Sequence, residues 1–99
     1  METVPVIRHN AEARCFECTV EGHRSVAEYS LDGERMIFTH TGVPAELRGR
    51  GIASHLVRTA VDYARREGKT IVPRCSYVAA WLERHPEVSW DIRKSHKNT

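Results

Sequence analysis

Hydrophobic and polar positions alternate in short runs along the first half of the chain and recur at helical spacing in the second half. The short runs predict four β-strands, at residues 4–8, 14–20, 24–31 and 35–43. Glu21-Gly22-His23 reverses the chain after the second strand, and Asp32-Gly33 is a two-residue hairpin signal after the third. The first half is therefore predicted to be an antiparallel meander. Pro5 places its first strand at a sheet edge, because proline cannot donate to a neighbouring strand.

The second half begins with a long helix and continues into one more strand. Apolar residues recur every three or four positions from Ile52 to Ala64, so they share one side of a helix, and Gly68 follows as a C-terminal stop. Residues 70–73 are predicted to form a short buried strand. Because a helix joins this strand to the fourth one, the two should lie parallel in a right-handed crossover.

The chain ends with a second helix at residues 76–85 and a candidate final strand at residues 87–90. We find no linker and no internal repeat, so residues 1–92 are expected to form a single domain, with residues 93–99 as a basic flexible tail. The expected fold class is α/β of the α+β kind. It has one mixed sheet, in which a four-stranded antiparallel meander is continued by a parallel β-α-β crossover, and two main helices.

The composition is that of a soluble globular domain. The 99 residues are 40% hydrophobic and 28% charged, and no apolar run is long enough to span a bilayer. Residues 1–5 lack the basic region and apolar run of a signal peptide, so we expect a cytoplasmic monomer without a membrane partner. The net charge of +2 does not by itself indicate nucleic acid. Twelve of the 15 basic residues are arginines, however, and these suit phosphate recognition.

A glycine-rich segment, Arg48-Gly49-Arg50-Gly51-Ile52-Ala53, lies between the fourth strand and the long helix. Glycines let the backbone pass close to a ligand, and the free N–H groups and positive dipole end of a helix favour an anion. The two arginines add positive charge at the same end. We therefore predict that this turn binds phosphate. A surface turn without a ligand is the alternative, because short glycine motifs also occur by chance.

The three cysteines indicate neither a disulfide framework nor a metal site. Cys15 and Cys18 are three residues apart on a predicted strand, so their thiols point to opposite faces of the sheet. The sequence has no second close cysteine pair, and its histidines are scattered. No metal is expected.

Ligands of open sheets settle beyond the carboxyl ends of parallel strands. Three segments of this chain should meet there: the glycine turn, residues 40–43 and residues 73–77. The sequence therefore predicts one crevice at this end of the sheet.

The chain resembles the GNAT superfamily of acetyltransferases, and in particular its very small YjdJ-like branch. Arg48-x-x-Gly51-x-Ala53 is similar to the superfamily signature Q/R-x-x-G-x-G/A, which binds the pyrophosphate of coenzyme A. The branch is recognised by longer segments, here residues 40–53 (HTGVPAELRGRGIA), 72–78 (VPRCSYV) and 81–87 (WLERHPE). The resemblance extends over nearly the whole chain.

The resemblance implies acetyl-CoA as co-substrate, without a metal. It implies that backbone N–H groups of one continuous segment hold the pyrophosphate, namely those of Arg48, Gly49, Arg50, Gly51, Ile52, Ala53 and Ser54. The pantetheine arm is implied to enter between the fourth and fifth strands, beside the backbone of Thr41 and Val43. The two N-terminal helices of larger members are missing, which implies an open acceptor side. Arg74, Ser76 and Gly42 differ from the residues common in relatives and bear on the acceptor pocket.

Acetyl transfer from a thioester to an amine needs a deprotonated amine, a stabilised oxyanion and a proton for the departing thiolate. A backbone N–H near Val43 is the candidate oxyanion donor. His40 is the candidate proton acceptor, because imidazole exchanges protons near neutral pH. Cys75 is the candidate acid, since a thiol matches the acidity of the leaving thiolate. A second interpretation makes Cys75 a nucleophile that becomes acetylated.

Each catalytic candidate also has a purely structural interpretation. A cysteine that follows a buried strand often packs as a small apolar residue. His40 shares a predicted strand face with Met36 and Phe38, so it could equally be a half-buried histidine bonded to backbone. Glu46 is an alternative base.

The sequence predicts a minimal acetyl-CoA-dependent N-acetyltransferase that acts by direct transfer. Candidate acceptors are a lysine side chain, a protein or peptide N-terminus, and a small amine. A coenzyme-binding module without catalysis is the first alternative, and it predicts saturable binding without turnover. A small nucleic-acid-binding domain is the weaker alternative, because the aromatic and basic residues form no shared stripe.

Overall fold

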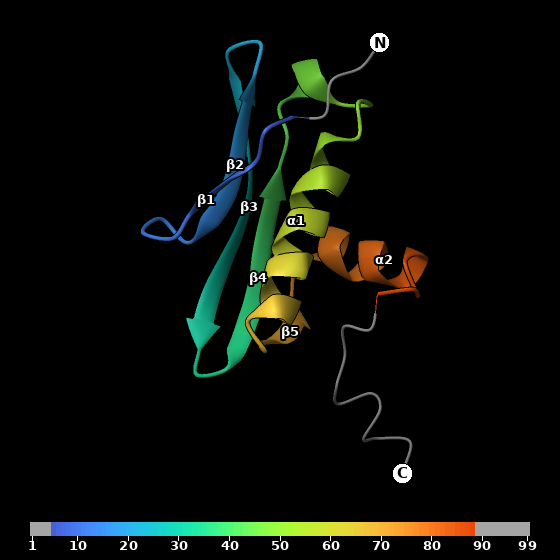
Figure 1. Ribbon diagram of the computed structural model, residues 1–99. Helices are drawn as coiled ribbons and strands as arrows, with labels where there is room; N and C mark the ends of the chain where they lie inside the picture. Colours follow the sequence, from blue (N-terminus) through green and yellow to red (C-terminus); the bar gives the residue numbers. More distant parts are fainter. Residues whose placement is uncertain (1–4, 89–99) are drawn as a thin grey trace.

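The computed structural model describes residues 5–88, which form one five-stranded sheet and two helices (Figure 1). The elements are, in chain order, β1 (Arg8–Asn10), β2 (Cys15–Val20), β3 (His23–Asp32), β4 (Arg35–Gly42), the 3-10 turn η1 (Ala45–Leu47), α1 (Ile52–Arg66), β5 (Thr70–Pro73) and α2 (Ser76–Arg84). The strands lie side by side in this order. β1 to β4 are antiparallel and β5 is parallel to β4. The predicted α+β fold, a meander continued by a parallel crossover, is confirmed.

The first strand lies at a sheet edge as predicted, but it begins later than residues 4–8. Its register places Arg8 opposite Glu17 and Asn10 opposite Cys15. The turn between Asn10 and Cys15 sets this register, and the last residue of β1 that pairs with β2, going away from the turn, is Arg8. Pro5 therefore lies before the strand.

The two hairpin turns at opposite ends of β3 both use left-handed backbone. Glu21 and Gly22 connect β2 to β3 with φ values of 53° and 80°. Between β3 and β4 the two loop residues are Gly33 and Glu34, because Asp32 is still paired with Arg35 in the ladder. The predicted Asp32-Gly33 loop is thus shifted by one residue, and Gly33 supplies the positive φ of 61°.

A β-bulge interrupts the pairing of β3 with β4. Tyr29 lies opposite Phe38, whereas the preceding residue, Glu28, lies opposite His40. Thr39 is therefore an extra residue in β4. An extra residue shifts the in-and-out alternation of every side chain that follows it in the strand.

The bulge decides which face of the sheet each residue at the end of β4 occupies. Met36 and Phe38 belong to the core. Beyond the bulge Thr41 is opposite the core residue Ala27, so Thr41 takes the core face and His40 takes the other one. The prediction that His40 shares a face with Met36 and Phe38 is wrong for this reason.

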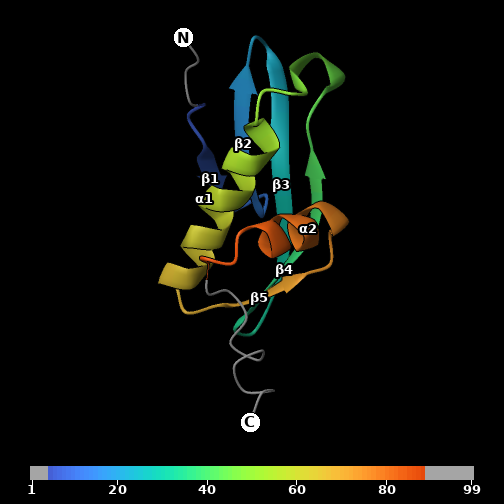
Figure 2. The same cartoon turned by 90° about the vertical axis from the view of Figure 1, so that its right-hand side faces the viewer.

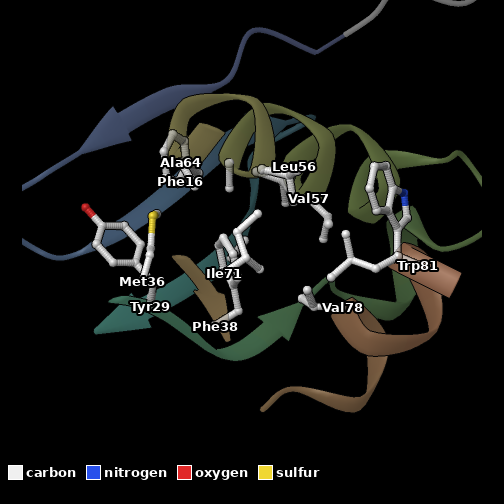
Figure 3. Packing of buried hydrophobic residues seen from close by; sticks show 14 of the residues in the cluster. Phe16, Tyr29, Met36, Phe38, Leu56, Val57, Ala64, Ile71, Val78 and Trp81 are labelled. Atoms are coloured by element: carbon white, nitrogen blue, oxygen red, sulfur yellow. The ribbon is translucent and has the colours of Figure 1, made fainter. Parts of the chain in front are cut away.

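Both helices cover the same face of the sheet, with α1 over its middle and α2 crossing near β4 and β5 (Figure 2). The core lies between them and the strands (Figure 3). Phe38 and Ile71 rise from the sheet toward Leu56 of α1, and Phe16 belongs to the same cluster. Trp81 of α2 is 1% exposed, as expected for a core residue rather than a ligand-stacking one.

The strand β5 has the predicted bounds, but it is not buried throughout. Only Ile71 of its four residues is fully buried, because β5 is the edge strand on the far side of β4. The candidate strand at residues 87–90 is not formed at Glu87 and Val88, which lie in a turn after α2. Its last two residues, and the proposed tail at residues 93–99, lie outside the described part of the chain.

The sheet face opposite the helices carries a polar cluster around Glu17. Arg24 donates to Glu17 Oε1 at 2.6 Å, and Arg8 lies 3.3 Å from Oε2. Cys15 Sγ, on the same face, lies 3.7 Å from Glu17 Oε1, whereas Cys18 belongs to the core beneath the helices. The two thiols point to opposite faces as predicted, and within residues 5–88 no group of three metal-ligating side chains converges.

Neither α1 nor α2 combines the length and the apolarity that a membrane crossing requires.

His9 of the edge strand packs into an aromatic cluster far from the glycine turn. Its ring stacks on Phe16 at 4.2 Å between centroids and meets the edge of Tyr63 at 4.5 Å. His9 Nε2 lies 2.6 Å from the Tyr29 hydroxyl oxygen. Burial lowers the pKa of His9, because desolvation disfavours the charged ring.

We expect this cluster to make the stability of the fold depend on pH. Below about pH 6.5 the unfolded chain binds a proton on His9 that the folded protein does not, so the free energy of unfolding decreases as the pH falls. Urea unfolding at neutral and mildly acidic pH measures the decrease. A His9→Gln variant should show a smaller one, and an equal decrease in both proteins would assign the effect to other groups.

Candidate functional site

The glycine turn connects η1 to α1, and its two glycines have left-handed backbone conformations. Gly49 and Gly51 have φ values of 84° and 78°, which other residues adopt only with strain. Leu47, which is fully buried, fixes the start of the turn in the core. A Cβ atom built on either glycine would meet no protein atom within 4 Å, so the space beside the turn is open to a ligand.

The N-terminus of α1 presents backbone donors without a capping side chain. Its first intrahelical hydrogen bond runs from His55 N–H to the Gly51 carbonyl, at 3.1 Å, and no side chain of residues 5–88 caps this end. The N–H groups of Ile52, Ala53 and Ser54 precede that bond. They lie at the positive end of the helix dipole, which is the environment that an anion needs.

Ser54 contributes to this end through its backbone alone. Its Oγ atom accepts a hydrogen bond from the indole N–H of Trp81 at 2.8 Å, which ties α1 to α2. The backbone N–H of Ser54, which the resemblance places at the pyrophosphate, is not used by this hydrogen bond.

The two arginines of the turn have different partners. Arg48 donates from Nε to the carbonyl oxygen of Val43 at 3.4 Å, so it leans back over the end of β4. Arg50 donates through both terminal nitrogens to the carboxylate of Glu21 in the β2–β3 turn, at 2.9 and 3.2 Å. Sequence reasoning missed Glu21, because nothing in the local sequence connects it with the glycine turn.

A pocket of about 370 Å³ joins the end of β4 to the start of α1 and to α2. It is lined by His40, Thr41, Gly42, Val43, Arg48, Ala53 and Tyr77. β5 pairs with β4 only as far as Phe38 opposite Pro73, and the Cys75 N–H then bonds to the Phe38 carbonyl oxygen at 2.8 Å. The three segments expected around one crevice do meet at this position.

His40 is one of the residues that line this pocket, and it is exposed, with its side chain on the sheet face opposite Thr41. No hydrogen bond or ion pair involves its ring within residues 5–88, so the half-buried, backbone-bonded histidine considered above is not what the structure shows. A Cβ on Gly42 would lie 2.9 Å from His40 Nε2. Glycine at position 42 therefore leaves room for the imidazole ring beside the strand.

Cys75 is the N-cap residue of α2 and lies beside the pocket. Its Sγ–H donates to the Thr41 hydroxyl oxygen, with 3.6 Å between the two atoms. Burial acts to raise the pKa of the thiol. It is outweighed by hydrogen bonds that the thiolate form accepts from the backbone N–H groups of Val78 and Tyr77 and from Thr41, so the pKa is lowered. Cys75 is thus more readily ionised than an ordinary cysteine. Cys75 also packs, partly buried, against the hydrophobic core, so its catalytic role stays a prediction beside the structural one.

Tyr77 also lines the pocket. The sequence predicted residues 73–77 as one segment of the crevice but gave Tyr77 no role of its own. Desolvation raises the pKa of its phenol, so the hydroxyl stays protonated at neutral pH. Glu46, the alternative base, does not line the pocket. Its side chain is 63% exposed and lies 4.0 Å from His23 Nδ1.

Comparison with known proteins agrees with this geometry. A family model for the GCN5-related N-acetyl-transferase matches residues 15–92. The chain belongs to this family. Its uncapped helix and adjoining pocket lie in the matched region, so the family assignment and the site concern the same part of the chain.

Several relatives of this chain carry the name Protein NATD1. The protein from Mus musculus is 32% identical over 83 residues, which are 81% of this chain and 76% of the relative. That from Homo sapiens is 32% identical over 83 residues, covering 81% and 74%. That from Danio rerio is 28% identical over 93 residues, covering 91% and 84%. The narrower assignment to the YjdJ-like branch stays a prediction.

Proposed function

We propose that this GCN5-related N-acetyltransferase moves the acetyl group of acetyl-CoA directly to an amine. One observation carries the proposal: a single pocket touches both the uncapped start of α1, at Ala53, and the end of β4 beside Cys75. An anion held at the start of α1 and a thioester held at the end of β4 would belong to one extended ligand. Coenzyme A, with its pyrophosphate and its terminal thiol, has this form.

The coenzyme would be held mainly by backbone. N–H groups from Arg48 to Ser54 would bind the pyrophosphate. The space beside Gly49 and Gly51, both of which have positive φ, is open for it. The pantetheine arm would lie along β4 at Thr41 and Val43, where β5 no longer pairs with it.

The transfer step needs one proton removed and one supplied. The neutral amine attacks the thioester carbon, a backbone N–H near Val43 stabilises the oxyanion, and the C–S bond then breaks. The departing coenzyme thiolate takes the proton of the Cys75 thiol, and solvent later returns a proton to Cys75. His40, one of the residues that line the pocket, would pass the amine proton to water.

A covalent route is the second candidate mechanism, and the environment of Cys75 favours it. N–H groups of Val78 and Tyr77 stabilise the thiolate form, which is the nucleophile. In that route the Cys75 thiolate attacks the thioester, coenzyme A leaves as its thiolate and takes up a proton, and the amine then removes the acetyl group from the enzyme. The direct route requires both substrates bound at once, whereas the covalent route gives ping-pong kinetics.

Calorimetric titration with acetyl-CoA, followed by a panel of amines that includes a lysine peptide and a free peptide N-terminus, tests the function. We expect saturable binding and release of coenzyme A with at least one amine. Binding without turnover across the panel would identify a coenzyme-binding module instead. Binding of duplex DNA that falls steeply with salt, without any coenzyme binding, would indicate a nucleic-acid-binding domain.

A further inference from the structure

Two side-chain contacts join the β2–β3 turn and the start of β3 to the segment that carries the glycine turn. Arg50 Nη1 donates to Glu21 Oε2 at 2.9 Å, and Arg50 Nη2 donates to Glu21 Oε1 at 3.2 Å, across 29 positions of the chain. Beside them His23 Nδ1 lies 4.0 Å from Glu46 Oε1. The β2–β3 turn lies at the end of the sheet where α1 begins (Figure 1).

Glu21 occupies a backbone conformation that glutamate rarely adopts. Its φ of 53° and the 80° of Gly22 form a two-residue turn that favours Asn, Asp or Gly at the first position. The conformation of the turn therefore does not explain why glutamate stands there. The longer carboxylate side chain, which Asn and Gly lack, is what reaches Arg50.

A carboxylate and a phosphate bind a guanidinium in the same way, through two parallel N–H bonds. Glu21 occupies both terminal nitrogens of Arg50. Arg50 itself stands between the two glycines of the turn proposed to hold the pyrophosphate. A coenzyme phosphate that binds this edge of Arg50 must displace the Glu21 carboxylate.

We propose that Glu21 limits coenzyme affinity by holding Arg50 in the free protein and yielding it to a coenzyme phosphate on binding. The proposal rests on the acetyl-CoA-binding function given above. Because the Glu21–Arg50 pair has to break, the net affinity is lower than the phosphate contacts alone would give. When the Glu21–Arg50 pair re-forms, it favours the release of coenzyme A after the transfer. Glu21 acts through Arg50 and is a positioning residue.

The carboxyl group of Glu21 reports on this exchange. Its hydrogen bond with Arg50, together with the charge of Arg50, lowers the pKa of Glu21 in the free protein. When a phosphate takes Arg50, the carboxylate loses this stabilisation and its pKa should rise. A contact that only fixes the shape of the turn would leave the pKa unchanged on binding.

The test compares Glu21→Gln with the unsubstituted protein by calorimetric titration with acetyl-CoA. We expect about two- to fivefold tighter binding in the variant, which is the scale of one exposed ion pair. Asp32→Asn is the matched control, because it neutralises an exposed carboxylate that pairs with Arg35 at the other end of β3. In an Arg50→Gln background the Glu21→Gln change should have no effect. Carbon-detected NMR titration of the Glu21 carboxyl group, with and without acetyl-CoA, measures its pKa.

The outcomes separate the two proposals. Equal or weaker affinity in Glu21→Gln, or a Glu21 pKa that does not rise in the complex, would overturn the exchange while coenzyme binding stands. If neither the unsubstituted protein nor Glu21→Gln binds acetyl-CoA saturably, the proposed function fails and the exchange fails with it.

Discussion

Replacing Gly51 with aspartate is expected to weaken acetyl-CoA binding by about a hundredfold or more, equivalent to about 3 kcal/mol. The new carboxylate would lie beside the free N–H groups of Ala53 and Ser54, where it would compete for them and repel the pyrophosphate. Asparagine and aspartate tolerate left-handed backbone better than other side chains, so the φ of 78° should not prevent folding. Calorimetric titration of the folded variant measures the loss.

Gly33→Asp provides the matched control for this experiment. Gly33 also has a positive φ, 61°, and a Cβ atom there also meets open space. The substitution therefore introduces the same side chain at a similar backbone cost, but at the other end of the sheet. Undiminished binding in a folded Gly51→Asp protein would move the phosphate site away from the start of α1.

Replacing Cys75 with alanine is expected to lower kcat by about a hundredfold or more while changing coenzyme affinity little, the usual size of a lost proton-transfer group. The thiol lies beside Thr41 at the β4 end of the pocket, where the thioester is proposed to react, whereas the pyrophosphate is proposed to bind at α1. Steady-state kinetics with the best amine of the panel, and calorimetry with acetyl-CoA, separate the two effects. An unchanged kcat would remove Cys75 from the mechanism.

Two further variants and one measurement refine the role of Cys75. Cys15→Ala removes a buried thiol whose pKa is raised by desolvation and by Glu17, and it should leave kcat unchanged. Cys75→Ser keeps a hydroxyl of similar shape that ionises far less readily, so its kcat should also fall. Mass spectrometry of the enzyme mixed with acetyl-CoA alone detects an acetyl group on Cys75 if the covalent route operates.

The elements that position the site could be predicted because local signals and burial agree there. α1 begins at Ile52 directly after the glycine turn, and β5 has the predicted bounds, Thr70 to Pro73. Both sets of bounds depend on apolar spacing and on glycine or proline nearby. The backbone part of the site follows from these elements, because a glycine turn between a strand and a helix places free N–H groups at the start of the helix.

The side-chain part of the site could not be predicted in the same way. The bulge at Thr39 lies in a polar stretch, Thr39-His40-Thr41, which contains no large apolar residue to indicate which face each position takes. The Glu21–Arg50 pair depends on where the fold places two distant turns, and no local pattern carries that information. Side chains beyond a bulge or between distant turns require the tertiary structure.

The β3–β4 turn at Gly33 and Glu34 lies at the opposite end of the sheet from the crevice, and both residues are exposed (Figure 1). Exposed turn tips of this kind tolerate covalent attachment and insertion. A fluorescent dye or a surface tether placed at Glu34 would therefore leave the crevice at the opposite end accessible to large ligands. The molecule can be immobilised by this end and screened against whole proteins as well as peptides.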